Sequence, residues 1–164
     1  MLSVKSSVVH ISLKMPSFKT YHNNKNIFSV DMMISYVNVF GLPKVKLPLE
    51  VFIPQLEEKV WGDWSPLDVL KNLDLKKYKE DAEQIQKADL AYPVIVTGKH
   101  KIVDGYHRVA KAYLEGKKNV DVYVFNSDLM NKFIINRDLD FVKVHDNTNI
   151  HELLEIWTRR FCKG

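Results

Sequence analysis

The stretch from Val94 to Gly116 reads VIVTGKHKIVDGYHRVAKAYLEG and decides the fold of the chain. Residues 92–96 are β-branched or aromatic apart from a proline near the start, where a strand tolerates a missing N–H group. Residues 97–99 predict a turn in which Gly98 takes a positive φ angle, and residues 101–103 predict a returning strand. The stretch therefore predicts a strand, a turn, a second strand and then a helix.

This helix is expected to begin at Gly105, with the Asp104 carboxylate as its N-cap. Gly116 is expected to end it in the left-handed conformation. Apolar side chains recur between these two points at helical spacing, which predicts one face packed against a sheet. They are Tyr106, Val109, Ala110, Tyr113 and Leu114.

The same stretch carries the net positive charge of the chain. Between Lys99 and Lys118, six basic residues stand against two acidic residues, a difference that equals the net charge of +4 of the whole chain. The first turn of a helix has free N–H groups and a positive dipole end, so it favours an anion. The turn contains His107 and Arg108, and the hairpin before it supplies further candidates for phosphate binding: Lys99, His100 and Lys101.

The sequence Asp104-Gly105-Tyr106-His107-Arg108 resembles the motif of the ParB/sulfiredoxin-like superfamily, and the resemblance covers residues 45–125. The motif is closest to the D-G-H-H-R of the free-serine kinases in that superfamily. The resemblance implies an α+β fold with a small mixed β-sheet flanked by helices. It also implies that Gly105, His107 and Arg108 bind the phosphates of ATP, ADP or CTP, with Mg²⁺ as a candidate cofactor.

Two departures from the superfamily narrow the activity that the resemblance implies. Sulfiredoxins have a catalytic cysteine directly before the His-Arg pair, where this chain has Tyr106, so sulfiredoxin activity is not expected. Partition ParB proteins have a G-x-R-R motif and a downstream helix-turn-helix domain. Here His107 takes the third motif position, and the chain that follows is too short for such a domain.

Three functions remain open after these departures. The first is phosphoryl transfer of the kinase type, or nucleotide hydrolysis, with an unknown small molecule as the acceptor. The second is a ParB-like DNA-binding protein or nuclease that uses the basic hairpin on backbone phosphates. The third is a member of the superfamily that only binds a partner protein.

Carboxylates near the motif are candidates for catalysis. Asp104 either caps the helix or also positions Mg²⁺ or the acceptor hydroxyl, and His107 is a further catalytic candidate. Residues 55–65 resemble a loop in which two tryptophans flank a glycine, and here Glu58, with Glu57 second, is a candidate to orient the acceptor. A second interpretation makes these carboxylates solvated loop charges and the tryptophans lids of the core.

A metal site formed by His100, Asp104 and His107 is not expected, because their spacing matches no standard zinc pattern. The single cysteine, Cys162, has no partner for an internal disulfide, which indicates a reducing compartment and a cytoplasmic location. With 46% hydrophobic and 27% charged residues, the composition is that of a globular chain, and its apolar runs are too short to cross a bilayer. No membrane partner is expected.

The remaining elements are expected around this centre. Residues 1–26 are expected to form a loosely ordered arm, and residues 27–164 a single domain. Apolar spacing and capping residues predict the other helices and strands. Helices are expected from Ser29 to Gly41, from Ser65 onward, over residues 75–87, after Asn126 and over residues 150–161, and strands over residues 44–54, 120–125 and 141–144.

Overall fold

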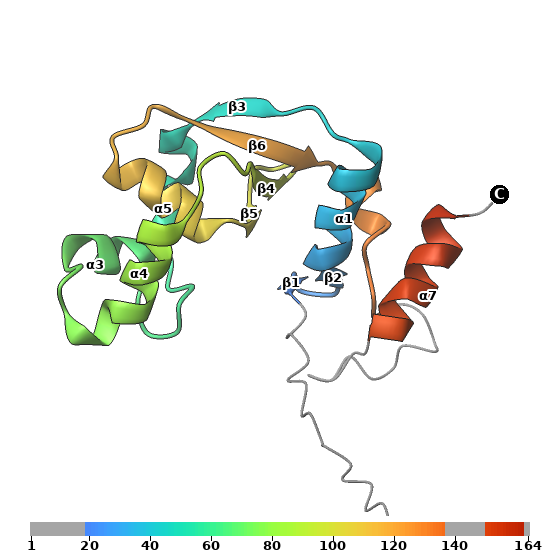
Figure 1. Ribbon diagram of the computed structural model, residues 1–164, viewed down its shortest axis with the longest axis horizontal. Helices are drawn as coiled ribbons and strands as arrows, with labels where there is room; N and C mark the ends of the chain where they lie inside the picture. The colour runs from blue at the N-terminus through green and yellow to red at the C-terminus, as the bar shows by residue number, and fades with distance from the viewer. Residues whose placement is uncertain (1–18, 137–149, 163–164) are drawn as a thin grey trace, which may run out of the picture.

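The computed structural model describes residues 19–136 and 150–162 of the chain. It is an α+β fold with two small sheets flanked by helices (Figure 1). The larger sheet has the strand order β3-β6-β4-β5, in which β4 and β6 are parallel and the other pairs antiparallel. Its strands are β3 (Val45–Pro48), β4 (Val94–Thr97), β5 (Ile102–Asp104) and β6 (Asn119–Phe125). The expected small mixed sheet with flanking helices is therefore confirmed.

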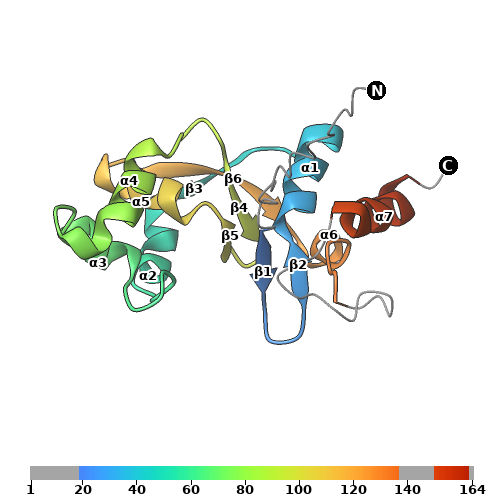
Figure 2. The same cartoon turned by 60° about the horizontal axis from the view of Figure 1, so that its bottom comes forward.

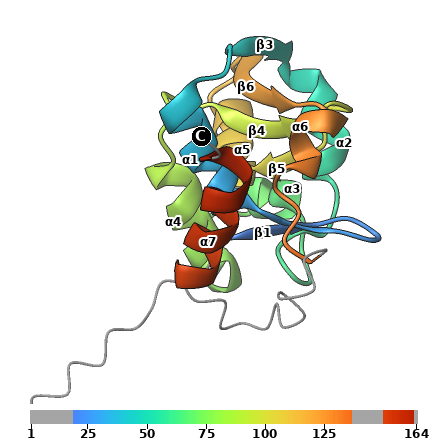
Figure 3. The ribbon, with the colours of Figure 1, turned by 90° about the vertical axis from the view of Figure 1, so that its right-hand side faces the viewer.

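Two hydrophobic clusters cover the two faces of this sheet. Along β4, Val94 and Val96 belong to one cluster and Ile95 to the other, as the alternation of a strand requires. The first cluster includes residues of α3 (Pro66–Lys71), α4 (Lys79–Lys87) and α5 (Tyr106–Leu114). The second includes residues of α1 (Val30–Phe40), α6 (Ser127–Asn131) and α7 (Ile150–Phe161). Figure 3 shows α1 and α7 in front of the sheet and α5 behind it.

The hairpin and the helix after it form as expected, but three details of the prediction were wrong. The positive φ angle in the turn is at His100 (60°) and not at Gly98. The N-cap of α5 is Gly105, because the Asp104 carboxylate is bound to Arg108 and does not cap the helix. Tyr113 and Leu114 are exposed, because the buried face of α5 is narrower than the apolar stripe and uses Val109, Ala110 and Ala112. Gly116 has the expected left-handed conformation, with φ of 66°.

The strand expected over residues 44–54 is shorter than predicted. It ends at Pro48, and the chain continues as a 3-10 helix, η1 (Leu49–Phe52), and a short helix, α2 (Ile53–Leu56). The buried side chains there are Leu49, Phe52 and Leu56, a spacing of three and four residues that suits helical turns better than a strand.

Other helix starts agree with the capping residues. Ser29 accepts a hydrogen bond from the N–H of Met32 at the start of α1, and Asn126 caps α6. Ser65 and Asp68 form a capping box at the start of α3. Residues 75–87 form the 3-10 helix η2 (Lys76–Tyr78) followed by α4. These starts were predictable because their hydrogen bonds are local in sequence.

A second, two-stranded sheet joins β1 (Thr20–His22) to β2 (Ile27–Ser29), directly before α1. This hairpin crosses the boundary expected at residue 26. The strand expected over residues 141–144 lies outside the described residues, as does most of the expected N-terminal arm. Among the described helices, none is both long and apolar enough to cross a membrane.

Candidate functional site

A cavity of about 650 Å³ lies beside the N-terminus of α5. Its walls come from α1, from the end of α4 with the segment that leads into β4, and from β5 with the start of α5. Figure 2 shows β4 and β5 between α1 and α5. The volume is in the range typical of pockets for small ligands. Four residues expected at the site line this cavity: Asp104, Gly105, His107 and Arg108.

The Arg108 side chain folds back over the N-terminus of its own helix. A Cβ atom placed on Gly105 would lie 3.1 Å from Nε and from Nη2 of Arg108, and also 3.1 Å from Cγ2 of Val94. Gly105 also has a φ angle of 115°, which L residues rarely adopt. A glycine is therefore required here, both by the backbone and by the guanidinium packed over it.

Asp104 is shared between two cations at the cavity wall. Its Oδ2 accepts a hydrogen bond of 2.6 Å from Nη2 of Arg108, and both side chains are about four-fifths buried. Its Oδ1 lies 3.6 Å from Nζ of Lys19, an exposed residue that also lines the cavity. Lys19 was missed in the sequence, because its distance from the motif along the chain gives no local signal.

His107 is held by residues from two other elements. Its Nε2 lies 3.5 Å from Oδ1 of Asp81 on α4, and its ring stacks on Trp61 with 4.4 Å between the ring centroids. Burial lowers the pKa of His107, and the hydrogen bond and charge of Asp81 oppose this shift only in part. The imidazole is therefore neutral at pH 7.

The two tryptophans of the loop before α3 are packed against the core, as the second interpretation of this loop expected. Trp61 and Trp64 pair as an isolated β-bridge, and both are partly buried against the first hydrophobic cluster. Trp64 donates a hydrogen bond of 2.8 Å from Nε1 to Oδ2 of Asp81. The Asp81 carboxylate thus joins the tryptophan loop to the motif histidine.

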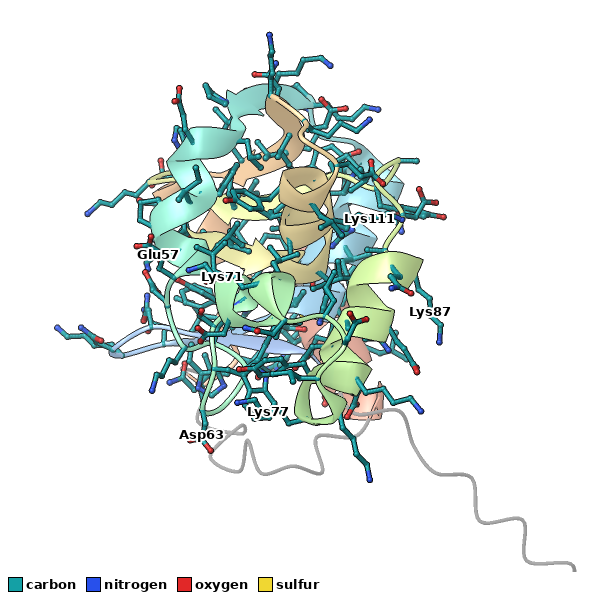
Figure 4. All side chains as sticks on the ribbon, turned by 90° about the vertical axis from the view of Figure 1, so that its left-hand side faces the viewer. Glu57, Asp63, Lys71, Lys77, Lys87 and Lys111 are labelled. Atoms are coloured by element: carbon teal, nitrogen blue, oxygen red, sulfur yellow. The ribbon has the colours of Figure 1, made fainter. Side chains whose placement is uncertain are left out.

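Asp81 contacts the motif histidine but was not among the site residues expected from the sequence, which predicted only a helix over residues 75–87. A signal was present, because Asp81 lies three residues after the buried Tyr78 and four before the buried Ile85, on the same side of the helix. Lys111 of α5, labelled in Figure 4, holds the C-terminal end of α4 by donating from Nζ to the carbonyl oxygens of Gln86 and Ala88.

The basic hairpin and Glu58 lie outside the residues that line the cavity. Lys101 forms an ion pair with Glu58, with 2.8 Å between Nζ and Oε1, and both side chains are about half exposed. Lys99 is exposed, as is Glu57 on the surface after α2 (Figure 4). The structure therefore pairs Glu58 with the hairpin and does not bring either to the cavity of Arg108.

Gln55 fixes the shape of that hairpin from inside the protein. Its buried side chain donates a hydrogen bond of 2.8 Å from Nε2 to the carbonyl oxygen of His100. Its Oε1 accepts a second hydrogen bond of 2.8 Å from the N–H of Ile102. These two bonds hold His100 at its positive φ angle. The His100 side chain does not line the cavity, so it is not placed with Asp104 and His107.

Tyr106 lines the cavity and is close enough to Glu58 to feel its charge. Burial, and next the nearby charges of Glu58 and Tyr21, raise the pKa of Tyr106 to about 12. Its hydroxyl therefore stays protonated at neutral pH and is a hydrogen-bond donor at the cavity wall. Among the described residues, no three His, Cys, Asp or Glu side chains are close enough together to hold a metal ion.

The cavity thus combines a helix N-terminus, two cations and a neutral histidine with an apolar wall. Comparison with known proteins does not assign this chain to a family. No family model, no curated protein and no solved structure matches the chain.

Proposed function

We propose that this chain is a ParB/sulfiredoxin-like protein that binds a nucleotide in the cavity beside α5 and acts in phosphoryl transfer or nucleotide hydrolysis. The observation that carries the proposal is the position of Arg108, whose guanidinium lies over the N-terminus of α5 at the cavity wall. Gly105 has no side chain with which to cap that terminus. N–H groups, a helix dipole and a guanidinium at one point are the groups that bind phosphate most strongly.

The charged part of the cavity suits the phosphates. Among the residues that the structure describes, Arg108 donates only to Asp104 and only from Nη2, which leaves its other N–H groups for a phosphate oxygen. Lys19 adds a second positive charge at the same wall. A phosphate here contacts the first turn of α5 and two cations at once.

The apolar part of the cavity suits the nucleoside. This wall is formed by side chains of α1 and of the sheet: the partly buried Ile34, Val37, Val103 and Tyr123, and the buried Ile95. The exposed aromatic ring of Tyr92 adds to the rim. Apolar and aromatic surface next to an anion site favours ATP, ADP or CTP over inorganic phosphate as the ligand.

The groups that the cavity offers for phosphoryl transfer act by positioning the ligand and by stabilising its charge. Mg²⁺ is usually held by one or two carboxylates together with the substrate phosphates, and Asp104 is the carboxylate beside the proposed phosphate position. Bound there, the ion would neutralise charge on the transferred group. His107 lies at the same cavity wall, where its imidazole can contact a phosphate oxygen.

Calorimetric titration with ATP, ADP and CTP, with and without Mg²⁺, tests the proposal. Arg108→Ala is expected to weaken nucleotide binding by at least about tenfold, since a hydrogen bond to a charged group contributes about 1.5–3 kcal/mol. Lys118→Ala removes one positive charge from an exposed residue that does not line the cavity, so its affinity should match that of the unaltered chain. Equal affinity in Arg108→Ala and Lys118→Ala would remove the proposal.

A parallel titration with tripolyphosphate separates the two parts of the cavity. Val37→Ser, on the α1 wall, is expected to weaken ATP binding and leave tripolyphosphate binding unchanged. Arg108→Ala is expected to weaken both ligands. If Val37→Ser and Arg108→Ala have the same effect on tripolyphosphate, the assignment of the nucleoside to α1 is wrong.

A ParB-like DNA-binding protein or nuclease is the second candidate, because the Lys99 and Lys101 side chains lie outside the cavity on an exposed hairpin. Lys101 is already paired with Glu58, which reduces the free positive charge there. Salt-dependent DNA binding that is lost in Lys99→Ala and kept in Arg108→Ala would favour this candidate.

A further inference from the structure

One carboxylate outside the motif contacts the cavity histidine from a different element. The Oδ1 atom of Asp81, on α4, lies 3.5 Å from Nε2 of His107. Its Oδ2 atom accepts a hydrogen bond of 2.8 Å from Nε1 of Trp64. Its side chain is four-fifths buried. Asp81 therefore holds one edge of the imidazole, while Trp61 covers one face of the same ring.

We propose that Asp81 is a positioning residue for a phosphate contact of His107, and that the histidine takes up one proton from solvent when a phosphate binds. The inference rests on the proposed function, since it requires a phosphate at the N-terminus of α5. The Asp81 carboxylate orients the ring before binding and is its counter-charge afterwards.

The balance of charges around His107 supports this proton uptake. The charged groups that face it are Asp81 from α4, Asp104 from β5 and Lys19 from the segment before β1, with Arg108 next to it on α5. Their formal charges sum to zero while the imidazole is neutral. A phosphate brings at least one negative charge to this group, and a proton on His107 offsets part of it.

The partners of the imidazole make its protonated form stable once the phosphate is present. An N–H⁺ bond to a carboxylate is stronger than a neutral one, and Asp81 already faces Nε2. In the free protein, burial keeps the pKa of His107 below its ordinary value, so the proton is absent before the ligand arrives. Binding and protonation are therefore linked.

A purely structural role predicts something different for Asp81. If the carboxylate only joins the tryptophan loop to α4 through Trp64, its removal changes stability and leaves the pH dependence of binding as it was. Asp81→Asn distinguishes the two roles, because asparagine keeps an oxygen that can accept from Trp64 and loses only the charge. Glu80→Gln is the matched control, since it removes one negative charge from an exposed residue of the same helix.

The experiment is calorimetric titration of the full chain with tripolyphosphate at several pH values between about 6 and 8, on both sides of the ordinary histidine pKa. Each titration is run in two buffers of different ionisation enthalpy, which gives the number of protons taken up. Titration of the ligand itself is common to all variants, so it cancels when the variants are compared.

The unaltered chain and Glu80→Gln are expected to take up a proton that Asp81→Asn does not. Their affinity should fall more steeply with rising pH than that of Asp81→Asn, by up to about tenfold per pH unit. Equal proton uptake in all three proteins would overturn the inference. Binding without proton uptake in the unaltered chain would overturn it as well, while leaving the proposed function intact; no binding at all would remove both.

A measurement on the ligand-free protein distinguishes the loss of the Asp81 charge from a folding defect of the variant. The NMR titration of the His107 ring is expected to have a lower midpoint in Asp81→Asn, because Asp81 raises the pKa of this histidine. The dispersion of the same spectra reports whether the variant is folded. A midpoint that does not move in a folded Asp81→Asn protein would contradict the positioning role.

Discussion

Replacing Gly105 by alanine tests the geometry of the phosphate site more directly than replacing any charged residue. The backbone there has a φ angle of 115°, and a left-handed L residue costs about 1–2 kcal/mol. The new methyl group would also lie 3.1 Å from two guanidinium nitrogens of Arg108, so the guanidinium must move. Complete loss of its bond to the mostly buried Asp104 would cost about 1.5–3 kcal/mol more.

We therefore expect Gly105→Ala to lower the free energy of unfolding by about 2–4 kcal/mol, when part of the ion pair re-forms. Urea denaturation measures this change, and titration with ATP measures the loss of binding that accompanies it. Gly116→Ala is the matched control: Gly116 ends the same helix with φ of 66°, and a Cβ there would meet nothing within 4 Å.

The difference between the two variants isolates the contact with Arg108. Gly116→Ala is expected to show only the backbone cost, with unchanged affinity for ATP. If Gly105→Ala loses no more stability than Gly116→Ala and binds ATP equally well, the guanidinium does not depend on Gly105, and the reasoning about the site is refuted.

Two further predictions concern stability. Gln55→Leu is expected to lower the free energy of unfolding by about 2–4 kcal/mol in urea denaturation, because the carbonyl of His100 and the buried N–H of Ile102 lose their hydrogen-bond partner. Gln86→Leu, on an exposed face of α4, should lower it far less. Equal losses of stability in the two variants would contradict this prediction. Because the folded pKa of His107 is lowered, the unfolded chain binds more protons below the ordinary pKa of about 6.5, so stability should fall as pH decreases through that range. His107→Gln should reduce this dependence, and a slope of stability against pH that His107→Gln leaves unchanged would be evidence against the prediction.

The parts of the fold that could be predicted from the sequence are those fixed by local hydrogen bonds and apolar spacing. The capping residues Ser29, Ser65 and Asn126 all begin helices as expected. The hairpin and α5 were also recognisable from alternation followed by helical spacing. Here the physical cause lies within a few residues of the effect.

The errors occur where a distant or competing partner decides the outcome. Asp104 does not cap α5 because Arg108, one turn further along, takes its carboxylate. His100 takes the positive φ angle because Gln55 binds its carbonyl from another element. Asp81 joined the site only through its tertiary contacts with His107 and Trp64.

Lys19 lies in the cavity wall because its backbone is fixed at the beginning of α1. Its N–H donates a hydrogen bond of 2.7 Å to the carboxylate of Asp31, and its carbonyl oxygen accepts one of 3.0 Å from the N–H of Val30. A shortened version of the chain that starts after this residue would keep the entire Asp104–Arg108 motif and yet lack a cation next to Asp104. Such a version would bind the ligand more weakly than the full chain does. The cause would be the missing Lys19 cation, which inspection of the motif alone would not reveal.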